Sequence, residues 1–188
     1  SKNSDFVSFV HDIAAVALKN KPKDVDALMI LRMANGKTGT DTLTEMIQRI
    51  GENMKVRRFS ILSTSNGSPA GYIHMGGKIG TMVSLEGPKG EKAIEVGKDL
   101  AMHVAAAFPR YLTSAQVDKD ELAQEREIAR KKLIEEKKPE TMIEKILDGQ
   151  MTKFFKEVCL VDQTFVKDPN LSITKWLQQQ GYKVTDFV

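Results

Sequence analysis

The sequence offers almost nothing for disulfide chemistry. Cys159 is the only cysteine among 188 residues, so no disulfide can form within the chain, and this usage is typical of a reducing, cytoplasmic compartment. Its neighbours Val158 and Leu160 favour a small buried core residue over a reactive thiol. With 41% hydrophobic and 28% charged residues, the composition is that of a globular protein of one or two domains.

Long hydrophobic runs are also missing. The longest, such as residues 13–18 and 104–108, are well below the roughly 20 residues of a membrane-spanning helix, so we predict no membrane association. The net charge of +3 shows no strong excess of one sign. Lys55, Arg57 and Arg58 come nearest to a basic patch, but a solvated strand face explains them better, and we predict no nucleic-acid partner.

No motif for catalysis, metal binding or nucleotide binding stands out. His11, His74 and His103 lack cysteine or carboxylate neighbours at metal-ligand spacing, and we favour structural roles for His11 and His103. Residues 36–38, Gly-Lys-Thr, match the end of a phosphate-binding loop, but Leu31 stands where that loop needs glycine. The sequence therefore predicts no metal, no cofactor, no direct nucleotide binding and no covalent catalysis.

Two segments of the chain share one pattern. Residues 42–59 align with residues 172–187, and each reads as a short helix closed by glycine and followed by a strand. A more apolar helix precedes each segment, so the repeated unit is helix, helix, strand. Before the second unit, strands at residues 70–75 and 78–85 flank residues 76–77, a Gly-Gly pair suited to a two-residue turn. The pattern predicts an α+β fold with two related subdomains, each with a small antiparallel sheet packed by helices.

The first unit has no such hairpin ahead of it. We therefore expect the first subdomain, residues 1–66, to be incomplete at its N-terminal side. Phe6 fits the apolar stripe of the first helix, and Phe187 fits a terminal strand paired with Phe59, so we expect core roles for both phenylalanines.

Residues 113–160 interrupt the second subdomain, which comprises residues 67–112 and 161–188. A helix at residues 118–136 and a second amphipathic helix starting near Pro139 should pair as an antiparallel coiled-coil hairpin. The apolar positions expected in its seam are Leu122, Ala129, Leu133 and Ile134 from the first helix, and Met142, Ile143, Ile146, Leu147, Met151, Phe154, Phe155 and Val158 from the second.

The segment that follows the hairpin should be a surface loop. Residues 168–169, Asp-Pro, favour an extended or turning backbone, which closes a loop at residues 163–167. Phe165 and Val166 should then form an exposed apolar pair, an arrangement suited to binding another protein. His74, next to the predicted hairpin turn, should lie at a sheet edge.

Several stretches carry a resemblance to a known family. They are IGENMKVRR at residues 50–58, YIHMGGKIG at 72–80, AMHVAAAFPRYL at 101–112, and the KEVCL and QTFVKDP segments within 156–169. In this order, and over nearly the whole chain, they resemble bacterial elongation factor Ts, the nucleotide exchange factor of elongation factor Tu. The resemblance is to the core and coiled-coil region, without the N-terminal ubiquitin-associated-type domain.

The resemblance implies a partner and a binding surface. Members of the family bind elongation factor Tu and speed GDP release, and the matching contact positions are Ile50, Gly51, His74, Val166 and Lys167. Some relatives have methionine where this chain has Lys167. The family's Thr-Asp-Phe-Val wedge would precede residue 1, so we expect the chain to bind its partner but to exchange nucleotide poorly.

A second interpretation stays open beside this one. A structural or RNA-associated helical adaptor would use the charged hairpin as its binding surface, and its affinity would fall steeply with salt. A protein interface centred on apolar residues would be less sensitive to salt. The coiled-coil hairpin dimerises in some family members, so a homodimer also stays open.

Overall fold

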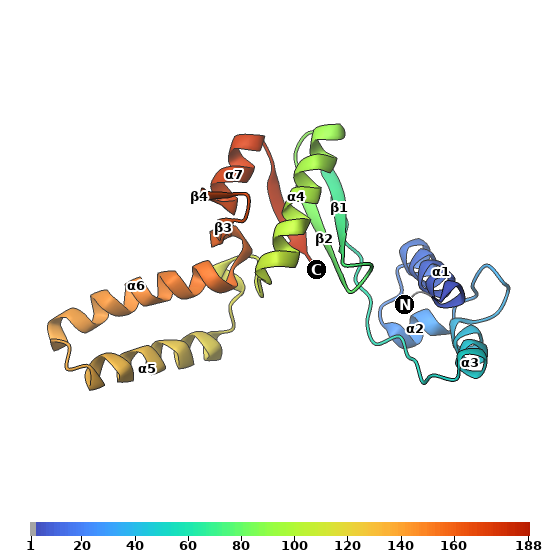
Figure 1. The fold of residues 1–188 in the computed structure, drawn as a ribbon, viewed down its shortest axis with the longest axis horizontal. Helices are drawn as coiled ribbons and strands as arrows, with labels where there is room; N and C mark the ends of the chain where they lie inside the picture. The colour runs from blue at the N-terminus through green and yellow to red at the C-terminus, as the bar shows by residue number, and fades with distance from the viewer. Residues whose placement is uncertain (1–2) are drawn as a thin grey trace. The chain divides into compact units, whose positions relative to one another are not determined.

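The chain forms two compact units in the computed structural model, which describes residues 3–188 (Figure 1). The units are Ser1–Ile61 and Leu62–Val188. Mixed helices and small antiparallel sheets confirm the predicted α+β class. The first unit ends at Ile61. The division into residues 1–66, 67–112 with 161–188, and 113–160 stays a prediction.

Within residues 3–61, the first unit contains three helices: α1 (Ser4–Asn20), α2 (Val25–Met29) and α3 (Gly39–Ile50). Helix α1 begins after Asn3, whose side chain accepts a hydrogen bond from the Phe6 amide, and Phe6 packs against the core as predicted. Thr38, the last residue of the Gly-Lys-Thr stretch, caps α3 and exchanges hydrogen bonds with Asp41. The buried core consists of Phe9, Ile13, Ala17, Leu28, Met33 and Met46.

The strand predicted at residues 55–59 does not form. No strand occurs in the described part of this unit, which contains only an isolated bridge between Arg32 and Thr38. Val56 and Phe59 still pack against the helical core, whereas Lys55 is exposed. A strand requires a hydrogen-bonded neighbour, and residues 3–61 supply none, so the apolar alternation is satisfied by packing without a ladder.

The second unit is built on a three-stranded antiparallel sheet with the order β1-β2-β5 (Figure 1). Strands β1 (Gly67–His74) and β2 (Ile79–Glu86) form the predicted hairpin. The turn differs from the prediction because four residues, 75–78, connect the strands instead of two. Met75, Gly76 and Gly77 all have positive φ, at 47°, 64° and 95°, a conformation that the two glycines adopt without steric cost.

Helix α4 (Glu91–Ala107) packs on β1 and β2, and α7 (Ile173–Gln180) precedes the edge strand β5 (Lys183–Phe187). Phe187 lies in this terminal strand as predicted, but its partner is Val83 and not Phe59. The prediction was wrong because β2 of the same unit offers the free edge on which β5 pairs. The buried core includes Val83, Leu85, Val96, Leu100, Leu160, Phe165, Ile173, Trp176, Leu177 and Val184.

Helices α5 (Lys119–Glu135) and α6 (Glu140–Val158) form the predicted antiparallel hairpin (Figure 1). Its distal seam is made by Leu133, Ile143 and Leu147, but Ile134 is 57% exposed and so lies outside the seam, contrary to the prediction. Met142 is likewise exposed. The prediction assigned both neighbours Leu133 and Ile134 to one face, whereas successive helical residues are about 100° apart and only one of them can point at the partner helix.

Charged side chains bridge the two helices across the hairpin. Arg126 pairs with Glu144 at 2.7 Å and with Asp148 at 3.3 Å, and Arg130 also contacts Glu144. The hydrogen bond from Arg126, followed by that from Arg130, lowers the pKa of the Glu144 carboxyl group. These arginines are therefore engaged within the hairpin.

Candidate partner-binding surface

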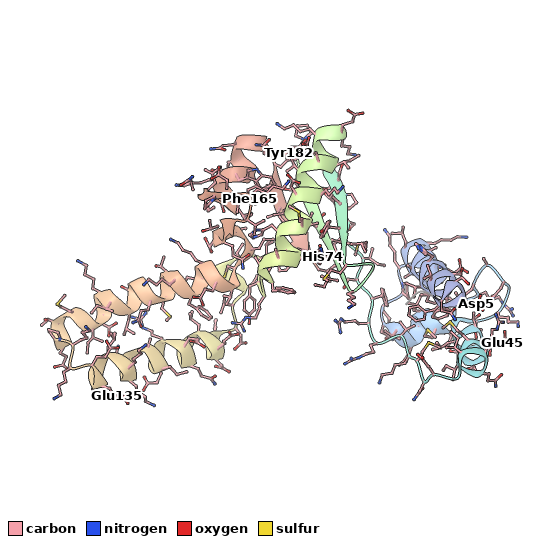
Figure 2. All side chains as sticks on the ribbon, viewed as in Figure 1. Asp5, Glu45, His74, Glu135, Phe165 and Tyr182 are labelled. Atoms are coloured by element: carbon pink, nitrogen blue, oxygen red, sulfur yellow. The ribbon has the colours of Figure 1, made fainter. Side chains whose placement is uncertain are left out.

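The loop predicted at residues 163–167 is only partly exposed. Phe165 (Figure 2) is 4% exposed, and its ring stacks on that of Trp176 with 4.1 Å between the ring centroids. Gln163 is also buried. The prediction of an exposed Phe165–Val166 pair was wrong for the phenylalanine, because α7 supplies an aromatic partner from eleven positions further along the chain.

Val166 remains outside the core. Its side chain is 47% exposed, as predicted, and it follows β3 (Thr164–Phe165), which pairs with β4 (Asp168–Ser172). The neighbouring Lys167 is exposed, and its Nζ atom lies 2.7 Å from Oδ1 of Asp99 on α4. Val166 and Lys167 form the turn that connects β3 to β4, and this turn leaves both residues at the surface while Phe165, the last residue of β3, is buried.

His103 on α4 anchors this segment from inside the unit. The imidazole is fully buried, and the Val166 amide donates to its Nδ1 atom over 3.3 Å. Its Nε2 atom lies 3.0 Å from Oε1 of Gln163. Burial lowers the pKa of His103, so the neutral form is favoured. The prediction of a structural role for His103 is confirmed, but no local sequence feature indicated its hydrogen bonds to Gln163 and to the Val166 amide.

His74 lies at the end of the edge strand β1, beside the hairpin turn (Figure 2). It is half-buried, and its Nδ1 atom lies 2.9 Å from the hydroxyl oxygen of Tyr72. Ile73 and Met75, on either side of it, are 69% and 66% exposed. The sheet-edge position is confirmed, and the end of β1 and its turn present two large exposed apolar side chains that are not among the predicted site residues.

Ile50 and Gly51 lie in the first unit, at the end of α3. Ile50 is half-buried against the helical core, and Gly51 is exposed in a left-handed conformation that ends the helix, with its amide donating to the Ile47 carbonyl oxygen at 2.8 Å. Of the five predicted site residues, Ile50 and Gly51 are consecutive in the first unit, and His74, Val166 and Lys167 belong to the second. Within residues 3–188, no hydrogen bond, ion pair or ring contact joins His74 to Val166 or Lys167.

A comparison with known families decides what these elements belong to. A family model described as "Elongation factor TS" matches residues 1–188. The chain belongs to the elongation factor Ts family. The match spans both units, so membership in the elongation factor Ts family covers the three-helix unit, the sheet-containing unit and the α5–α6 hairpin together, and it makes the chain a translation elongation factor.

Membership in the elongation factor Ts family leaves the individual contact positions as predictions. In the described residues, no group of three or more His, Cys, Asp or Glu side chains is arranged to hold a metal ion. The same residues include no helix long and apolar enough to cross a membrane. The exposed large apolar side chains of the second unit include Ile73, Met75 and Val166.

Proposed function

We propose that this chain binds elongation factor Tu and promotes release of GDP from it, as a nucleotide exchange factor without covalent catalysis. The whole-length match to the elongation factor Ts family is the observation that carries the proposal. The contact positions proposed for this partner are Ile50, Gly51, His74, Val166 and Lys167.

The proposed mechanism needs only linkage between two binding equilibria. If the chain binds the nucleotide-free form of elongation factor Tu more tightly than the GDP form, it must weaken GDP binding by the same factor. No base or nucleophile is required for this step. The side chain of Val166 is exposed, whereas its neighbours Phe165 and Lys167 contact Trp176 and Asp99. This arrangement supports a role for Val166 in binding the partner.

The direct test measures GDP release. A fluorescent GDP analogue is loaded on elongation factor Tu, and its dissociation rate is followed with and without the chain. The proposal expects a rate that rises with chain concentration, together with a complex that excess GDP dissociates. A chain that is folded by circular dichroism but neither forms this complex nor raises the dissociation rate would contradict the proposal.

Val166→Asp tests the contact itself. We expect its affinity for elongation factor Tu to fall about tenfold or more, because the complex would bury an unpaired carboxylate. Its thermal unfolding midpoint should stay near that of the parent chain, since Val166 is 47% exposed in the free chain. Isothermal calorimetry and a thermal melt give the two readouts.

Ile128→Asp is the matched control for that substitution. Ile128 is a similarly exposed aliphatic residue, at 61%, but it lies on α5 in the hairpin and outside the proposed surface. It should leave the affinity unchanged. Equal losses in both variants would remove Val166 from the site, and a loss confined to Ile128→Asp would favour the hairpin as the binding surface. A steep loss of partner affinity with rising salt would point the same way.

A further inference from the structure

The buried imidazole of His103 makes two hydrogen bonds of opposite direction. A backbone amide can only donate, so Nδ1 accepts from the Val166 amide and carries no proton. The side-chain amide of Gln163 is oriented by its own contacts, because its Nε2 atom donates to the carbonyl oxygens of Glu157 at 2.7 Å and Ala107 at 3.4 Å. Its Oε1 atom therefore faces His103 and accepts from Nε2, which assigns the neutral Nε2–H tautomer.

A second group on α4 holds the next residue of the same segment. Asp99 precedes His103 by one helical turn and lies on the same helix face. Its carboxylate pairs with Lys167 at 2.7 Å. On the other side of Val166, Phe165 is buried against Trp176. Consecutive residues 165–167 are therefore fixed by three separate contacts, and the Val166 side chain is the part of the segment left exposed.

We propose that His103 is a positioning residue for partner binding, which holds the Val166 backbone so that the Val166 side chain is presented to elongation factor Tu. This inference rests on the proposed function. If the residue only filled space, leucine would suit the position better than histidine. A buried imidazole needs hydrogen-bond partners for both nitrogens to offset its desolvation. His103 meets this requirement by linking Gln163 and Val166, the two ends of the segment that carries Phe165.

Two polar variants distinguish the hydrogen bond made by Nδ1 of His103 from the one made by Nε2. In His103→Asn, the amide oxygen can take the place of Nδ1 and accept from Val166, but the Nε2 donor is lost. In His103→Gln, the longer side chain can replace the Nε2 donor toward Gln163, but the acceptor for the Val166 amide is lost. Each variant gives up one buried hydrogen bond, so both should lower the thermal unfolding midpoint by similar amounts.

Amide hydrogen exchange in the free full-length chain tests the positioning. His103→Gln should exchange the Val166 amide proton about tenfold faster than His103→Asn, because only the Gln variant leaves this amide without its acceptor. His103→Gln should also bind elongation factor Tu about tenfold more weakly than the parent chain, whereas His103→Asn should stay within about threefold.

The pH dependence of partner affinity distinguishes a positioning role of His103 from a role in filling space, because filling space does not depend on the protonation state. Above about pH 6.5, the imidazole of His103 is neutral in both the folded and the unfolded chain. Below this pH the unfolded chain takes up a proton, whereas burial disfavours protonation of His103 in the folded chain. The contribution of His103 to the free energy of unfolding is therefore lost as the pH falls. Once His103 is protonated, Nδ1 can no longer accept from Val166. Because burial lowers the pKa of His103, the ratio of the parent affinity to the His103→Asn affinity should stay constant from pH 7.5 to about pH 6.5 and fall only at lower pH.

The charged groups on the elements around His103 are present in both proteins of that ratio. They include Lys98 and Asp99 on α4, Asp162 on the short 3-10 turn η2 (Leu160–Asp162), Lys167 in the turn after β3, and Asp168, the first residue of β4. Equal Val166 exchange in the Gln and Asn variants, or equal partner affinities, would overturn the inference. Absence of partner binding by the parent chain would instead overturn the proposed function, and the exchange comparison alone would then decide whether His103 positions Val166.

Discussion

Cys159 is fully buried where α6 ends, next to Val158 and Val117. Burial, with a smaller contribution from the Asp162 carboxylate, raises the pKa of its thiol to about 11. At pH 8 roughly one molecule in a thousand then carries a thiolate, and that thiolate is shielded from reagents. We expect an aromatic disulfide reagent to label the native chain at least about a hundredfold more slowly than the chain in denaturant.

Absorbance of the released thiol follows this reaction, and the denatured chain supplies the control with one reactive group per molecule. Complete labelling of the native chain within minutes, without loss of helical signal, would contradict the burial of Cys159. The interpretation of this residue as core filler followed from its apolar neighbours in the sequence and is confirmed by its position.

The different burial of Phe165 and Val166 could not be predicted from the residues themselves. Both are apolar and lie in a short segment before Asp168-Pro169, and nothing local distinguishes the buried residue from the exposed one. Trp176 makes the difference, because its ring covers Phe165 and leaves Val166 outside. The positions in the proposed site could thus be identified from family motifs, whereas Asp99, His103 and Gln163 behind them could not.

At the scale of elements, replacing either of two helical glycines with alanine should change the free energy of unfolding in opposite directions. Gly97 of α4 faces β1, and a Cβ atom there would come within 2.4 Å of the Ala70 Cβ. Gly149 of α6 is exposed, and a Cβ there would meet nothing within 4 Å. Gly149→Ala should raise the free energy of unfolding by about 0.5–1 kcal/mol through the higher helix propensity of alanine. Gly97→Ala should lower it by about 1–3 kcal/mol, because overpacking outweighs the same gain.

Urea unfolding followed by circular dichroism measures both changes, and each glycine is the control for the other. A stabilising Gly97→Ala would mean that α4 can move away from the sheet at little cost. The close approach of α4 to β1 is a tertiary property, since the two glycines occupy equally plausible helical positions in the sequence.

At the scale of the whole molecule, the two units have separate cores. The core of the first unit contains residues between Phe6 and Phe59, and the cores of the second lie between Ala70 and Phe187. We therefore expect residues 62–188 to fold when produced alone. Trp176 is the only tryptophan of the chain, so its fluorescence reports the second unit alone.

The fluorescence-detected urea transition of residues 62–188 should have the same midpoint and slope as that of the full chain. Far-ultraviolet circular dichroism of the full chain also contains the helices of the first unit and provides the comparison. Loss of a cooperative transition in the isolated segment would contradict independent folding of this unit.

The types and order of most elements, the β1–β2 hairpin, the α5–α6 hairpin and the resemblance to elongation factor Ts could be predicted from local properties of the chain, namely periodicity, capping residues and motifs. Three features depend on the three-dimensional arrangement: residues 55–59 form no strand, β5 pairs with β2, and Phe165 is buried while Val166 is not. Strand pairing and burial depend on partners far away in the chain, and the same apolar residue is core or contact surface according to whether such a partner covers it.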